Sequence, residues 1–101
     1  MIQSKTAVIG GAGFVGSRLA ERFDSFGQKY LICDINTENQ SDNIIYLDVE
    51  DEKSLEQLDG FESIVNLAAI HRDDVRPLTR YDDVNVQGAI NVCEAAKKYN
   101  I

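Results

Sequence analysis

Four glycines near the start of the chain constrain its fold more than any other feature. They lie in the stretch IGGAGFVG, residues 9–16, between a short apolar run at 6–9 and a helical apolar pattern over 14–26 that Gly27 ends. The stretch can be read as G-x-G-x-x-G from Gly11 or as G-x-x-G-x-x-G from Gly10. In either frame, a glycine loop between a buried strand and a helix lets backbone N–H groups approach an anion, usually a pyrophosphate.

Apolar runs and helical patterns alternate along the rest of the chain. Runs at 30–33 and 44–47 predict two more buried strands, each followed by an aspartate, and a short helix is expected after the acids at 50–52. A fourth strand is predicted over 63–69 and a last helix over 81–99. The expected apolar face of that helix consists of Val86, Ala89, Ile90, Cys93 and Ala96.

Strands that alternate with helices indicate right-handed β-α-β units and a parallel sheet. We therefore expect an α/β fold, the first half of a Rossmann-type three-layer structure. It should contain about four strands in the order 3-2-1-4, with helices on both faces of the sheet. The 101 residues allow a single domain, 1–101, with one modest core.

Composition limits the partners of such a domain. The chain is 44% hydrophobic and 27% charged, and its formal net charge of -7 without a long basic run disfavours nucleic acid. No apolar run approaches the roughly 18–20 residues of a membrane span, and the start carries no signal-peptide cleavage site. Cys33 and Cys93 match no metal or redox spacing. We expect a soluble, cytoplasmic protein with reduced cysteines and without a metal site or a membrane partner.

Asp34 adds a second observation to the glycine loop. It ends the second predicted strand, 18 residues after Gly16, near the position from which a carboxylate accepts hydrogen bonds from the ribose hydroxyls of a bound adenosine. A 2′-phosphate on that ribose would meet its negative charge, and the next residues, Ile35 and Asn36, are not basic. The pattern therefore favours NAD over NADP as a dinucleotide ligand. The alternative is a tight glycine turn beside a solvated acid, with no ligand.

These features resemble the N-terminal part of the extended short-chain dehydrogenase/reductase family, the NAD-dependent nucleotide-sugar epimerases and dehydratases. The resemblance covers nearly the whole chain and rests on AVIGGAGFVGSRLAERF, CDI, LDVED, VNLAAIHRDDV and NVQGAINVCEAAKK. The family loop is G-x-x-G-x-x-G, usually preceded by threonine, where this chain has Ile9. The resemblance selects the frame Gly10, Gly13 and Gly16 and leaves Gly11 supernumerary.

Carried onto this sequence, the resemblance implies which residues bind the cofactor. The glycine loop and the backbone amides of Phe14 and Val15 would hold the pyrophosphate, and Asp34 the adenosine ribose. Asp48 and Val49 would border the adenine, with the Asp48 carboxylate accepting from its exocyclic amine; taken alone, Asp48 is equally well explained as a strand-end acid. The implied cofactor-binding residues are Gly10, Gly13, Phe14, Val15, Gly16, Asp34, Asp48, Val49, Leu67, Ala68 and Ala69.

Further assignments concern the end of the fourth strand and the helix after it. Leu67, Ala68 and Ala69 would pass beneath the cofactor towards the nicotinamide ribose, although without the resemblance we would assign them to the core. Asn85 matches a family asparagine whose side-chain amide bonds to backbone and helps to hold a water chain, whereas an isolated helix asparagine is more often a surface residue. His71, the only histidine, follows the fourth strand on the ligand side; we favour a solvated loop histidine over a substrate contact.

The catalytic residues of the family are absent from this sequence. In that family, hydride transfer to and from NAD uses a tyrosine, a lysine four residues later, and a serine or threonine. None of the four tyrosines in this chain has a lysine four residues later. We therefore expect the N-terminal portion of a longer enzyme, truncated before its catalytic and substrate-binding parts. A sheet that stops at the fourth strand also exposes an edge through which homo-oligomers can form.

Three functions fit these observations. The leading hypothesis is the NAD-binding portion of a nucleotide-sugar epimerase or dehydratase that works by transient hydride transfer, with a nucleotide-sugar substrate in the full-length protein. The second is a non-catalytic dinucleotide-binding or interaction module. The third is a reductase of the same superfamily that acts on a non-sugar ketone.

Overall fold

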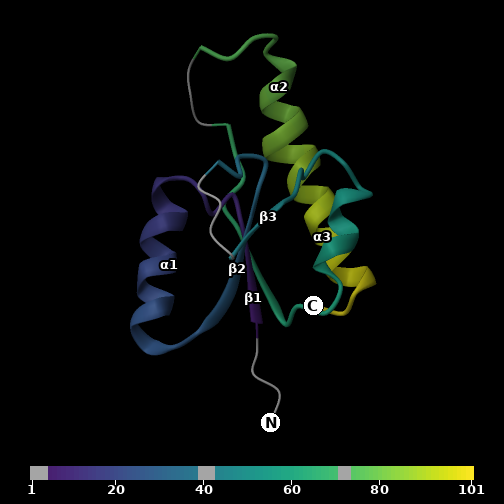
Figure 1. Cartoon of the computed structure of the whole chain (residues 1–101). Coiled ribbons are helices and arrows are strands. Elements are labelled where there is room, and N and C mark those ends of the chain that lie inside the picture. Colours follow the sequence, from purple (N-terminus) through teal and green to yellow (C-terminus); the bar gives the residue numbers. More distant parts are fainter. Residues whose placement is uncertain (1–4, 39–42, 71–73) are drawn as a thin grey trace.

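A parallel β-sheet between two helical layers forms the structure, a computed structural model that describes residues 5–38, 43–70 and 74–101. Its four strands, β1 (Lys5–Ile9), β2 (Lys29–Asp34), β3 (Ile44–Tyr46) and β4 (Ser63–Asn66), lie in the order β3-β2-β1-β4. Helix α1 (Phe14–Phe26) covers one face of the sheet (Figure 1). The predicted fold class and strand order are confirmed.

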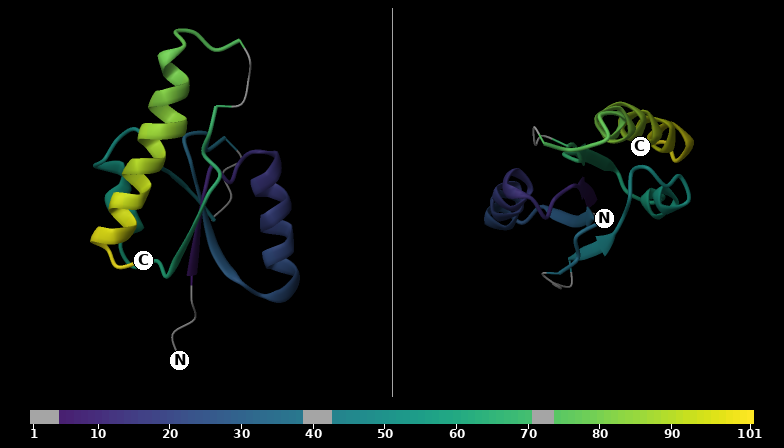
Figure 2. Two further views of the ribbon diagram at one scale, coloured as in Figure 1. Left: turned by 180° about the vertical axis from the view of Figure 1, so that it is seen from behind. Right: turned by 90° about the horizontal axis from the view of Figure 1, so that it is seen from above.

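The opposite face of the sheet is covered by two helical segments (Figure 2). One is the 3₁₀ helix η1 (Ser54–Leu58), and the other is a long helix made of α2 (Thr79–Tyr81), the π-helical segment η2 (Asp82–Gly88) and α3 (Ala89–Lys98). Figure 1 shows that the α2 end of this long helix projects past the carboxyl ends of the strands. The hydrophobic core lies mainly on this side of the sheet and contains Ala7, Ile9, Cys33, Leu47, Val49, Leu55, Leu58, Val92 and Ala95.

Strand β1 lies inside the sheet, between β2 and β4, and both of its faces are covered. Ala7 and Val8 are fully buried, which is the continuous apolar pattern of a central parallel strand. The register places Ile9 beside Cys33 of β2 and Asn66 of β4. All strands therefore end at one edge of the sheet, and the glycine loop begins there.

Helix α1 has the predicted bounds. It begins after Gly13 and ends at Gly27, whose φ of 76° places it in the left-handed region. The N–H groups of Gly27 and Gln28 donate to the carbonyls of Asp24 and Phe23, the usual glycine termination of a helix. This local signal needs no tertiary contact, which is why the sequence predicts it.

The predicted apolar face of the last helix is wrong in part. Val86 and Ile90 are 53% and 46% exposed, and Cys93 is exposed as well. The side that faces the core carries Gly88, Asn91, Val92 and Ala95. A search for apolar residues at helical spacing does not count a glycine or an asparagine. In addition, the i→i+5 bonding of a π-helix breaks the 3.6-residue period on which the prediction depends.

Strand β4 is shorter than predicted. It ends at Asn66, where the Asn66 side chain accepts a hydrogen bond from the N–H of Ala68 at 3.1 Å. The last bond from this segment to β1 runs from the N–H of Leu67 to the carbonyl of Ile9 at 2.7 Å, and the Asn66 side chain satisfies the next N–H locally. Residues 67–69 consequently lie beyond the end of the sheet. As the last strand in the order, β4 is an edge strand; association of copies through it stays a prediction.

Candidate functional site

The glycine loop joins the end of β1 to α1 through backbone contacts that exclude side chains. Gly10 has a φ of 75°, and a Cβ there would lie 2.7 Å from the amide nitrogen of Ala68. A Cβ at Gly16 would lie 2.3 Å from the Cα of Gly11, and one at Gly11 would lie 2.9 Å from the carbonyl oxygen of Val8. Gly11 is therefore a packing residue, and the expectation that it is supernumerary is wrong, because α1 presses directly on its backbone.

Gly13 differs from the other three glycines of the loop. A Cβ there would lie 3.6 Å from the carbonyl oxygen of Gly10, an ordinary contact. Gly13 is the N-cap of α1, and no side chain caps this end of the helix. The next two side chains, Phe14 and Val15, are 75% and 61% exposed. The first turn of α1 thus presents its amides and its positive dipole end outwards, as an anion site requires.

One cavity brings the predicted cofactor residues together. It has a volume of about 760 Å³ and lies at the carboxyl ends of the strands, within the roughly 300–1,000 Å³ usual for small-molecule sites. Its lining includes all of the eleven predicted cofactor-binding residues, from the glycine loop to residues 67–69. It also includes Ile35, Glu50, Ile70, Arg80 and Val84, which the sequence did not indicate.

The Asp34 carboxylate lies between the glycine loop and the end of β2. Its Oδ2 accepts from the N–H of Ala12 at 3.0 Å, and its Oδ1 accepts from the N–H of Asn36 at 2.9 Å. A carboxylate has about four acceptor positions, so each oxygen keeps a further lone pair for a ligand hydroxyl. Asp34 therefore fixes the loop as well as lining the cavity, a second role that the sequence did not reveal.

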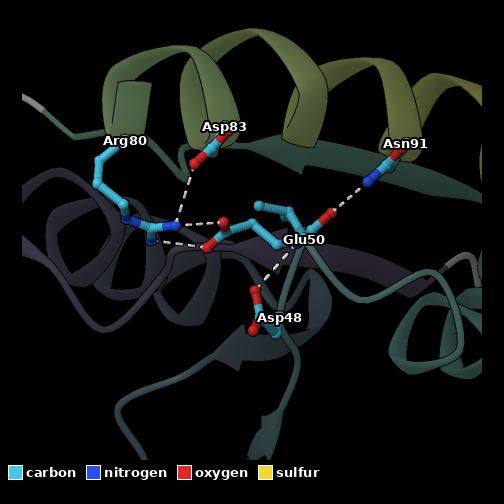
Figure 3. Close-up of polar contacts among 6 residues, drawn as sticks. Asp48, Glu50, Arg80, Asp83 and Asn91 are labelled. Atoms are coloured by element: carbon cyan, nitrogen blue, oxygen red, sulfur yellow. Dashed lines mark hydrogen bonds and ion pairs between the residues drawn. The ribbon is translucent and has the colours of Figure 1, made fainter. Parts of the chain in front are cut away.

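Hydrogen bonds hold the three consecutive residues 48–50, which follow β3. The Asp48 Oδ1 accepts from the N–H of Glu50 at 3.0 Å, and the N–H of Asp48 donates to the Ser54 hydroxyl at 3.0 Å. The carbonyl of Val49 accepts from Nδ2 of Asn91 at 2.9 Å (Figure 3). These bonds hold the backbone of 48–50 in place at this wall of the cavity.

Gly88 allows the long helix to approach this wall. A Cβ at Gly88 would lie 2.7 Å from Cγ2 of Val49. The buried Asn91 also accepts from Nε2 of Gln87 at 2.9 Å, so both ends of its amide are satisfied. An isolated glycine within a helical pattern was the one signal in the sequence for this close packing.

An ion pair that the sequence did not indicate spans the rim of the cavity. Nη1 and Nη2 of Arg80 donate to Oε1 and Oε2 of Glu50 at 2.6 and 2.8 Å (Figure 3). The Arg80 hydrogen bond lowers the pKa of Glu50 below its ordinary value. The two residues lie 30 positions apart, beyond the reach of any local spacing rule.

Asn85 bonds the backbone just beyond β4. Its Oδ1 accepts from the N–H of Ile70 at 2.6 Å, and its Nδ2 donates to the carbonyl of the same residue at 2.9 Å. Asn85 thus makes the kind of backbone contact that the resemblance implied, while its part in a water chain stays a prediction. Leu67 and Ala68 are half-buried and Ala69 is exposed; the prediction for His71 lies outside the described residues.

Within residues 5–38, 43–70 and 74–101, no group of three or more His, Cys, Asp or Glu side chains is placed to hold a metal ion. No helix there is long and apolar enough to cross a membrane. Of the two free cysteines, Cys33 is buried, which raises the pKa of its thiol to about 12, and Cys93 is exposed. Cys33 is therefore a packing residue without a reactive thiolate.

The NAD dependent epimerase/dehydratase family matches residues 6–101 of the sequence. The chain belongs to this NAD-dependent epimerase/dehydratase family. The match confirms the resemblance drawn from the glycine loop and the strand ends. It also confirms the predicted cofactor at the level of the family, which is NAD-dependent.

Individual known proteins are similar over nearly the whole chain. An N-acetyl-alpha-D-glucosaminyl-diphospho-ditrans,octacis-undecaprenol 4-epimerase from Escherichia coli O157:H7 is 41% identical over 103 residues, 93% of this chain and 29% of the relative. The Bordetella bronchiseptica enzyme WbmG, solved with NAD and UDP, is 29% identical with a TM-score of 0.82, covering 99% of this chain and 36% of its own.

A UDP-glucose 4-epimerase from Thermotoga maritima, solved with UDP-glucose, is 28% identical with a TM-score of 0.82 and covers 96% of this chain. The match covers 35% of that structure. This chain therefore spans about a third of the length of these members of the epimerase/dehydratase family. The activity and substrate of a whole enzyme are consequently matters for proposal.

Proposed function

We propose that this chain binds NAD in the cavity at the carboxyl ends of the strands, as the NAD-binding portion of a nucleotide-sugar epimerase or dehydratase. The observation that carries the proposal is the cavity itself, because the glycine loop, Asp34 and the segment 48–50 all line it. These groups come from three successive strand ends, which is where open parallel sheets bind dinucleotides.

The residues of the cavity fit the parts of NAD in order. The pyrophosphate would lie on the first turn of α1, where Gly13 leaves its approach open. The adenosine ribose would bond to the remaining lone pairs of Asp34, and the adenine would extend towards Asp48 and Val49. When bound, NAD supplies the site with a hydride acceptor; the chain's own residues bind and orient it.

Charge in the cavity supports NAD over NADP. Among the described residues, its lining carries three carboxylates, Asp34, Asp48 and Glu50, and one cation, Arg80, which is bonded to Glu50 through both terminal nitrogens. A 2′-phosphate would therefore meet the negative charge of Asp34, and the one cation of the described lining is already paired. NADP is thus disfavoured by the negative charge of the cavity as well as by the lack of a basic residue directly after β2.

For the protein to which this portion belongs, we propose transient hydride transfer on a nucleotide sugar. Hydride transfer is supported by the family and by relatives that are 4-epimerases. The nucleotide sugar is supported by the UDP-glucose 4-epimerase of Thermotoga maritima, whereas the Escherichia coli relative is named for a sugar linked through diphosphate to undecaprenol. A non-catalytic module and a reductase acting on a non-sugar ketone stay hypotheses from the sequence, as does a cytoplasmic location.

Isothermal titration with NAD and NADP tests the cofactor assignment. NAD should bind more tightly than NADP. Asp34→Asn keeps the shape of the side chain but loses its charge. It should weaken the binding of NAD on the order of tenfold and narrow the difference in affinity between NAD and NADP. Asp59→Asn, an exposed acid outside the cavity, is the matched control and should change neither. Equal affinity of the unmodified protein for NAD and NADP would contradict the assignment.

A further inference from the structure

Arg80 is the one cationic side chain among the described residues that line the cavity. It comes from α2, which projects past the carboxyl ends of the strands (Figure 1). Its partner Glu50 follows β3, so the pair joins two elements on the same rim of the cavity. Binding of the pyrophosphate and ribose, as proposed above, does not use either side chain.

The Arg80 guanidinium is held in a fixed orientation. Both of its terminal nitrogens donate to the Glu50 carboxylate, at 2.6 and 2.8 Å, and Nη1 also lies 3.5 Å from Oδ2 of Asp83 (Figure 3). Two parallel bonds between a guanidinium and a carboxylate fix the plane of both groups. Because these bonds lie in that plane, they do not use the broad faces of the guanidinium.

Glu50 is itself held in place by the backbone around it. Its N–H donates to Asp48, and the carbonyl of the preceding residue, Val49, accepts from Asn91. The carboxylate that orients Arg80 therefore extends from a fixed segment. These backbone bonds fix the position from which the Glu50 side chain extends, and the two bonds to Arg80 hold its carboxylate.

The order of binding groups decides which part of the ligand would reach Arg80. With the pyrophosphate at the α1 amides after β1 and the ribose at Asp34 after β2, the base continues to the next strand end. That strand is β3, and the cavity lining there consists of Asp48, Val49 and Glu50, with Arg80 beside them. A guanidinium face stacks well on an aromatic ring.

We propose that Arg80, oriented by Glu50, stacks on the adenine ring and is a positioning residue for the adenine half of the dinucleotide. The inference rests on the proposed function, since it places NAD in this cavity. It differs from a purely structural role, in which the ion pair only joins α2 to the segment after β3. It also differs from attraction by charge alone, which lysine would supply equally well.

Titration of the protein with NAD separates these roles. Arg80→Ala and Arg80→Lys should both raise the Kd for NAD by about two- to thirty-fold, because neither keeps a planar cation. Arg22→Ala, an exposed arginine of α1 outside the cavity, is the control and should bind NAD normally. Unfolding by urea, followed by circular dichroism, checks that each variant is folded. A Kd unchanged in both Arg80 variants, or restored by lysine, would overturn the inference.

Nuclear magnetic resonance gives a readout that a structural role would not move. On addition of NAD, the side-chain Nε–Hε signal of Arg80 should shift upfield through the ring current of adenine, and addition of nicotinamide mononucleotide, which has no adenine, should leave it in place. An equal response to both probes would overturn stacking. If the unmodified protein bound no NAD, the proposed function would fail together with the inference; normal NAD binding with no effect at Arg80 would remove the inference alone.

Discussion

Replacing Gly16 by alanine tests how tightly α1 packs on the glycine loop. The added Cβ would lie 2.3 Å from the Cα of Gly11 and 2.4 Å from its carbonyl oxygen. Both are backbone atoms, so no side chain can rotate away. To reach the 3.4 Å of an ordinary contact, the helix and the loop would have to separate by about 1.1 Å.

The expected cost combines two opposing effects. Overpacking of a closely packed site costs about 1–3 kcal/mol, and contact with the backbone of Gly11 favours the upper end. Alanine regains about 1 kcal/mol, because glycine within a helix is unfavourable. Gly16→Ala should therefore lower the free energy of unfolding by about 2 kcal/mol, or the melting temperature by roughly 10 °C for a domain of this size.

Urea denaturation followed by circular dichroism measures this change. Gly13→Ala is a control from the same loop, because its Cβ would lie 3.6 Å from the nearest backbone atom, and its free energy of unfolding should stay within about 1 kcal/mol of the unmodified protein. Equal midpoints for Gly16→Ala and Gly13→Ala would refute the packing argument.

Three further predictions address other parts of the structure. In native protein, iodoacetamide should modify the exposed Cys93 and spare Cys33, whose pKa is raised to about 12 by burial; mass spectrometry showing equal modification would contradict this. The pKa of Glu50 is lowered chiefly by its arginine partner, so the stability that it adds is complete above the ordinary value of 4.5 and is lost as the pH falls through the lower folded-state value. The difference in unfolding free energy between unmodified protein and Glu50→Gln should accordingly shrink below pH 4.5, and a constant difference down to pH 3 argues against it. Asn85→Ala should lower the free energy of unfolding by about 1 kcal/mol and speed hydrogen exchange at the Ile70 amide, which donates to the Asn85 side chain at 2.6 Å. An unchanged exchange rate would count against the contact.

Local signals account for what the sequence predicts well. The bounds of α1 follow from Gly13 and Gly27, and the strand order follows from the alternation of buried runs with helices. The glycine loop and Asp34 are predictable as one site because parallel strand ends meet at one edge of the sheet. The assignment of Asp48, Val49 and residues 67–69 to the same site needed the family resemblance.

The remaining features depend on contacts between distant positions. Arg80 and Glu50 each have the sequence pattern of an ordinary exposed charge, and only the fold brings them to 2.6 Å. The role of Gly11 depends on how closely α1 approaches its backbone. Asn91 is polar yet buried, because its partners come from another element and from its own helix. The contacts from Arg80 to Glu50 and from Asn91 to Val49 have no fixed spacing that a pattern can detect.

The π-helical segment η2 has a consequence for changes in chain length. It lies between α2, which carries Arg80, and α3, which carries Asn91, and both side chains bind the segment 48–50. Loss of one residue from η2 would let it rewind as α-helix. Because i→i+5 bonding turns the chain less per residue than the roughly 100° of an α-helix, the shorter segment would cover nearly the same rotation. Arg80 and Asn91 would then keep their relative orientation. Loss of one residue from α3 before Asn91 has no such compensation and would rotate Arg80 against Asn91 by about 100°.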